Sequence, residues 1–141
     1  MLNELLNMKG KLTIELNGEV VQEVDNLVVT VGKNFVASRM TGTSPAVMSH
    51  MAIGTTATAA ANGDTALGAE AARVALASGV TASAVVTYIA TFPAGTGTGA
   101  IVEAGLFNAL SAGTMLARTV FSVINKGAAD SMTITWTVTV S

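Results

Sequence analysis

The chain contains no cysteine, one histidine and two prolines. Without cysteine, neither a disulfide nor a thiolate metal site supports the fold. The single histidine, His50, cannot form a zinc site, which uses several His or Cys ligands. A Ser-His-Asp triad is not indicated either, because no Gly-x-Ser-x-Gly elbow accompanies His50. Acidic residues do not cluster as a calcium loop requires. We therefore expect no catalytic residue, no cofactor-binding residue and no metal ligand, and predict that the chain is not an enzyme.

Charge is also scarce. Charged residues make up 11% of the 141 positions and hydrophobic residues 50%, whereas ordinary soluble domains carry about 25% charged residues. The seven basic residues are scattered and the net charge is -2, so binding to nucleic acid has no electrostatic basis. No apolar run reaches the roughly 18 residues of a membrane helix, so membrane insertion is not expected. The remaining interpretation is a surface covered by other protein subunits.

The length suits a single domain. Residues 1–10 are expected to form an N-terminal arm, and residues 11–141 a single β-sandwich domain. In the arm, Leu2, Leu5 and Leu6 stand at helical spacing, but a segment this short does not hold a helix in water by itself. The arm is therefore expected to dock on a partner.

The rest of the chain has the pattern of an all-β protein. Asn17-Gly18 between two alternating segments predicts a β-hairpin. Further strands are expected at residues 27–31, 48–54, 68–76, 81–92, 100–107, 114–124 and 132–140, and one short helix at 32–40. For 68–76 a helix is the alternative. Strands separated by turn signals about 8–12 residues apart favour an antiparallel β-sandwich, jelly-roll or immunoglobulin-like.

Two kinds of candidate site residue follow. The strands at 81–92 and 132–140 carry no charge and are expected to be interior or at subunit contacts. The candidate oligomer interface comprises Leu2, Leu5, Leu6, Met8, Phe92 and Phe107, although for the two aromatic residues a position in the core is the more frequent alternative. Glu103 stands in an apolar strand, where an unpaired buried charge is too costly. A structural salt bridge with Arg118 is the favoured interpretation. Four alternatives remain open for the Glu103 carboxylate: a salt bridge with Arg73, a hydrogen bond from a backbone amide, a solvent-facing position and a salt bridge between subunits.

The C-terminal half resembles a known family. Ala94–Phe107 with its Glu-Ala-Gly-Leu-Phe strand, Gly113–Phe121 with Leu-Ala-Arg, and the turn at 125–130 before the final Thr/Val strand are similar to modules of tail-fibre and collar-fibre proteins of tailed bacteriophages. This resemblance implies a virion protein on the tail, neck or capsid surface, assembled in the cytoplasm of the bacterial host. It implies a homo-oligomer, a trimer or higher ring, that contacts other virion proteins.

The chain departs from a full fibre, because it has no shaft repeat and no receptor-binding tip. A short fibre, an adaptor or a decoration protein suits its size better, and a host surface glycan is a further candidate partner. One alternative is a carbohydrate- or ligand-binding β-sandwich that uses the loops at 55–64 and 93–99. Another is a self-assembling filament or surface-layer subunit, which differs in symmetry, an open helix instead of a closed ring.

Overall fold

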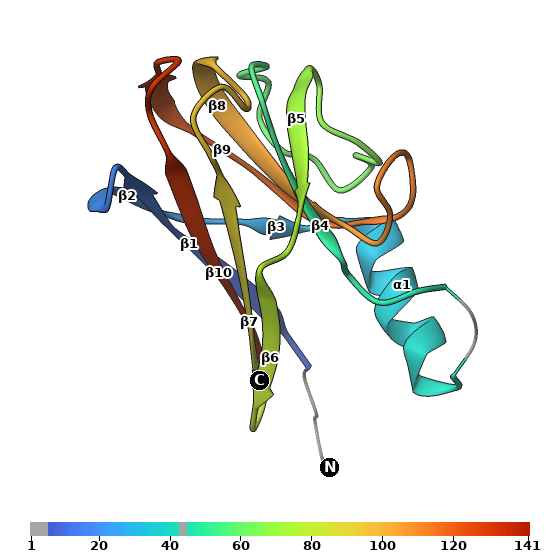
Figure 1. The fold of residues 1–141 in the computed structure, drawn as a ribbon. Helices are drawn as coiled ribbons and strands as arrows, with labels where there is room; N and C mark the ends of the chain where they lie inside the picture. The colour runs from blue at the N-terminus through green and yellow to red at the C-terminus, as the bar shows by residue number, and fades with distance from the viewer. Residues whose placement is uncertain (1–5, 43–44) are drawn as a thin grey trace.

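The computed structural model describes residues 6–42 and 45–141. Two five-stranded antiparallel sheets pack against each other as a β-sandwich (Figure 1). Sheet A has the order β2-β1-β10-β7-β6, and sheet B the order β3-β9-β8-β4-β5. The strands are β1 Met8–Leu16, β2 Glu19–Asp25, β3 Leu27–Val28, β4 His50–Gly54, β5 Glu70–Ala75, β6 Ser78–Ala82, β7 Val85–Phe92, β8 Gly99–Phe107, β9 Met115–Lys126 and β10 Met132–Val140. The predicted all-β sandwich with one short helix is confirmed.

The N-terminal hairpin forms at the predicted turn. Asn17 and Gly18 have φ of 52° and 81°, and positive φ at both central residues is what a tight type I′ turn requires. The strand before it is longer than expected, since β1 begins at Met8 and Asn7 exchanges two backbone hydrogen bonds with Ser141. Residues 8–10, which the sequence placed in the arm, therefore belong to sheet A.

The segment expected to be one long strand at 81–92 is instead a hairpin. It consists of the end of β6, a two-residue turn and β7, which pairs back on β6 from Val85 opposite Ala82. Ser83 makes the turn with φ of 52°. No Gly, Pro or Asn marks this turn, so the run of strand-forming residues concealed it.

The core lies between the sheets and is built by strand alternation. In β10, Ile134, Trp136 and Val138 point inward and are at most 2% exposed. Phe92 and Phe107 are also buried, at 0% and 1% exposure. Their assignment to an oligomer interface was wrong, because the fold of a single chain already covers both rings.

The outer face of sheet B is covered by the chain itself, in contrast to sheet A. Leu67, from the long loop between β4 and β5, packs with Phe107, Met115, Ala52 and Val29 in a second buried cluster. Both faces of β8 are thereby buried, and the seven successive residues from Ile101 to Phe107 are shielded from solvent.

The helix α1, Thr30–Met40, packs on β9. It begins two residues before the predicted 32–40 segment. Close contact is made at Gly32, where a Cβ atom would lie 2.0 Å from the backbone oxygen of Leu116. Phe35 follows on the same side and is buried.

Gly32→Ala is expected to destabilise the protein even though alanine is the better helix former. Helix propensity alone favours alanine by up to about 1 kcal/mol. The added methyl group meets a backbone atom that cannot swing away, and overpacking of this kind typically costs about 1–3 kcal/mol. Chemical denaturation should show a lower midpoint than wild type. Gly63→Ala is the matched control, because nothing lies within 4 Å of its Cβ position. An equal midpoint for the two variants would contradict this account of α1 packing.

Candidate assembly surface

One half of the outer face of sheet A carries no charge. Alternation turns Thr133, Thr135, Thr137 and Thr139 of β10 away from the core, and the register sets outward residues of β7 and β6 beside them. We name this surface the uncharged face; it comprises Thr133, Thr135, Thr137, Thr139, Val85, Thr87, Ile89, Thr91, Ser78, Val80 and Ala82. Thr91 and Thr133 share a hydrogen bond between their hydroxyl oxygens at 3.0 Å.

The other half of the same sheet is charged. The register of β1 and β10 places Lys9, Lys11 and Glu15 opposite threonines of the uncharged face. Lys11 forms an ion pair with Glu23 of β2 at 3.6 Å, and both side chains are about half exposed. The outer face of sheet A is therefore charged over β1 and β2 and uncharged over β10, β7 and β6.

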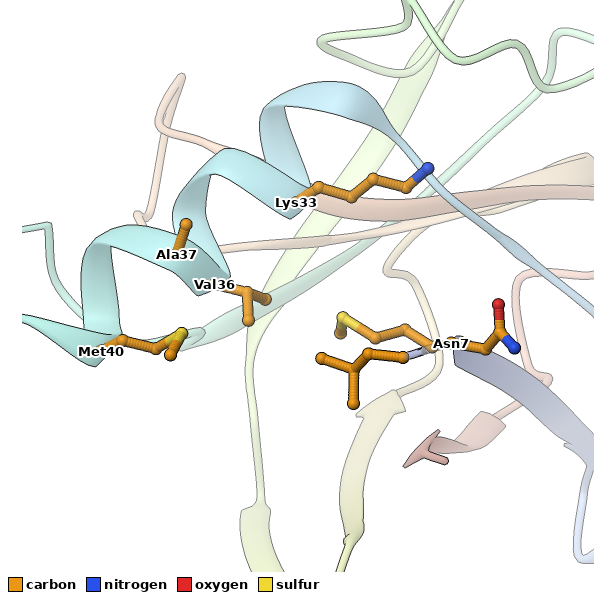
Figure 2. Close-up of a pocket in the computed structure, with 7 residues that line it drawn as sticks. Asn7, Lys33, Val36, Ala37 and Met40 are labelled. Atoms are coloured by element: carbon orange, nitrogen blue, oxygen red, sulfur yellow. The ribbon is translucent and has the colours of Figure 1, made fainter. Parts of the chain in front are cut away.

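An apolar groove lies between α1 and the start of β1 and has a volume of about 330 Å³. Figure 2 shows Val36 and Met40 extending from α1 toward the N-terminal segment at Asn7. Leu6 and Met40 are 76% and 84% exposed. Of the predicted interface residues, Leu6 and Met8 line this groove, whereas Leu2 and Leu5 lie outside the described residues.

Glu103 and Arg118 form a fully buried ion pair. Their relative exposures are 0% and 2%. Oε1 of Glu103 accepts from Nε of Arg118 at 3.2 Å and from Nη2 at 3.0 Å. The strands β8 and β9 bring the two residues together as sheet neighbours. The structure thus places Glu103 beside Arg118, both within one chain.

The same carboxylate holds the loop between β4 and β5 against sheet B. It accepts backbone N–H groups of Thr56, Gly68 and Ala69, each at 2.9 Å. Burial by itself raises the pKa of Glu103, but these three amides and Arg118 outweigh it, and the net pKa lies below the ordinary value of 4.5. We call this arrangement the Glu103 clamp.

Arg118 extends the clamp to the middle of the loop. Its Nη1 donates to Oδ2 of Asp64 at 3.0 Å, and Nη2 also donates to the carbonyl of Thr58 at 3.0 Å. The loop between β4 and β5 includes the low-complexity segment 55–64, considered above as a ligand-binding site, and is therefore held at both ends and at Thr58 and Asp64.

Arg73, the alternative partner of Glu103, serves another loop. Its guanidinium lies 3.7 Å from the ring centroid of Phe107 and pairs with Glu70 at 2.7 Å. It also donates to the carbonyls of Ala109 and Ala112. The β8–β9 loop is thereby fastened to β5.

Two further residues with buried polar atoms were not singled out by the sequence analysis. Lys126, assigned to a turn, is 2% exposed, and its Nζ donates to the carbonyl of Pro93 at 3.0 Å. The available signal was alternation, since Lys126 shares a strand face with buried Ile124. Asn26 is half-buried, and its Oδ1 accepts from Nε1 of Trp136 at 3.1 Å.

No chemical centre emerges from the described residues. Among them, no three His, Asp or Glu side chains lie close enough together to hold a metal ion. His50 is half-buried, with its Nδ1 2.7 Å from the hydroxyl of Ser49. No helix within residues 6–42 and 45–141 is long and apolar enough to cross a membrane.

Comparisons with protein-family models, with curated proteins and with solved structures found no match to this chain.

Proposed function

We propose that this chain is a non-enzymatic structural subunit of a tailed-bacteriophage virion. It assembles with copies of itself and with other virion proteins as a short fibre, an adaptor or a decoration protein on the tail, neck or capsid surface. The observation that carries the proposal is the uncharged face of sheet A. A chain with 11% charged residues leaves eleven outward positions on three adjacent strands without one charge.

Burial of such a face by another subunit has a low desolvation cost. Threonine and valine side chains lose few strong water contacts, whereas a buried unpaired charge costs several kcal/mol. Stable interfaces bury about 800 Å² on each partner. The groove beside α1 adds a second apolar contact area at Leu6 and Met40.

The internal fastening of the loops also suits an assembly subunit. The Glu103 clamp and Arg73 fix two long loops within the chain. A subunit whose loops are already ordered loses less conformational entropy on association. The resemblance to fibre modules supports the same function, and its motifs fall on β8, β9 and β10.

The mass of the purified chain tests self-assembly. Light scattering behind a sizing column should give a defined multimer whose mass does not change over a range of concentrations. A monomer at every concentration would contradict self-assembly.

The virion assignment is tested separately by mass spectrometry of gradient-purified particles of the phage that encodes the chain. The protein should occur there in a constant ratio to the other structural proteins, and its absence would overturn the assignment.

A further inference from the structure

The two sheets have four edge strands, which differ in how they are protected. Edge strands expose unpaired backbone N–H and C=O groups, and proteins usually guard them with charge, with short length or with a cover. β2 carries Glu19, Glu23 and Asp25, and β5 carries the ion-paired Glu70 and Arg73. β3 is only two residues long.

β6 has none of these protections. Its five residues, Ser78–Ala82, include no charge, and four of the five are exposed. Val80 at its centre is 60% exposed. In the described part of the chain, β7 is the one strand paired with it. The β6–β7 hairpin projects at the end of the sandwich where the C-terminus lies (Figure 1).

We propose that β6 pairs in antiparallel fashion with β6 of a second copy of this chain, about a two-fold axis through Val80. This inference deepens the proposed function and rests on its claim that copies of the chain associate. The pairing sets Val80 opposite Val80 of the second copy and Ser78 opposite Ala82. It joins two sheets of type A into one continuous ten-stranded sheet and merges the two uncharged faces.

The choice of a second copy as partner follows from symmetry and charge. A two-fold contact brings the same surface of both copies together. At β2 this would gather Glu19, Glu23 and Asp25 with their equivalents, and like charges on paired strands repel. At β6 it gathers only uncharged residues, and the central valine pair gives the cross-strand contact that favours pairing.

A cysteine cross-link tests the pairing directly, because the chain has no cysteine of its own. Opposed residues on antiparallel strands have Cβ atoms about 4.5–5.5 Å apart, near the spacing that a disulfide spans. Under mild oxidation, Val80→Cys should give a covalent dimer, and a reducing agent should cleave this dimer to monomers. Val20→Cys on the edge strand β2 is the control, since Val20 is similarly exposed at 52%. Equal yields from the two variants would overturn the inference.

Val80→Lys provides the second measurement. It sets two ammonium groups opposite each other and should remove the two-fold contact, so that light scattering reports half the wild-type mass. Val20→Lys should keep the wild-type mass, and the far-UV circular dichroism spectra of both variants should match that of wild type, because both side chains are exposed on the single chain. A multimer of unchanged mass in Val80→Lys would refute the β6 contact and leave self-assembly through other surfaces intact. If the wild type were a monomer and Val80→Cys gave no covalent dimer, both the β6 contact and self-assembly would be refuted.

Discussion

Glu103→Gln is expected to lower the free energy of unfolding by about 3–5 kcal/mol, the cost typical of removing one partner from a buried ion pair. Within the described residues, five groups hydrogen-bond to the carboxylate and all are donors: three backbone amides and two N–H groups of Arg118. The glutamine NH₂ group would face donors at whichever oxygen it replaced. Arg118 would also lose one of its two carboxylate partners, and Glu103 and Arg118 are 0% and 2% exposed.

Glu70→Gln is the matched control for this experiment. Glu70 also pairs with an arginine, Arg73, but its side chain is 35% exposed. Pairs with a solvated partner typically contribute about 0–1 kcal/mol. Urea denaturation should therefore separate the two variants clearly. Similar midpoints for Glu103→Gln and wild type would show that the clamp does not stabilise the fold.

The pH dependence of stability gives an independent check on the Glu103 clamp. The folded-state pKa of Glu103 lies below the ordinary value of 4.5. Its stabilisation is therefore complete above about pH 4.5 and is lost as the pH falls through the folded-state pKa. The stability difference between wild type and Glu103→Gln should narrow over that acidic range. A constant difference from pH 7 to pH 3 would contradict the assignment.

Local signals in the sequence predicted those parts of the fold that local chemistry determines. Asn17-Gly18 specified a turn because both positions need positive φ. The alternation of Thr with apolar residues in β10 places Trp136 in the core and Thr135 on the outer face, since neighbouring residues of a strand point to opposite sides.

Two of the features that were missed depend on contacts between distant segments. Glu103 accepts from amides that lie 34 to 47 residues earlier in the chain, and no local pattern announces such a pairing. Phe107 ends the run Ala104–Phe107, which has no polar side chain, so alternation could not tell which face Phe107 occupies. The run is apolar because a loop covers the outer face of β8, and that cover is also a long-range feature.

Trp136→Ala is expected to be the second severely destabilising substitution. Trp136 is 0% exposed and stands between Leu12 and Tyr88 in the centre of sheet A. Loss of such a ring leaves a cavity in the core and costs about 3–5 kcal/mol. It also removes the N–H group that satisfies Oδ1 of Asn26. The unfolding transition should be followed by far-UV circular dichroism, because the chain has no other tryptophan to report on folding.

Trp136→Phe divides the effect of Trp136→Ala into packing and hydrogen bonding. Phenylalanine restores most of the buried ring but not the donor. Oδ1 of Asn26 would then lose this bond, next to an Nδ2 atom that already has no hydrogen-bond partner among the described residues. An unsatisfied buried group costs about 1–3 kcal/mol. Trp136→Phe should therefore fall between wild type and Trp136→Ala. If Trp136→Phe were as stable as wild type, the bond to Asn26 would contribute nothing, and Trp136 would act through packing alone.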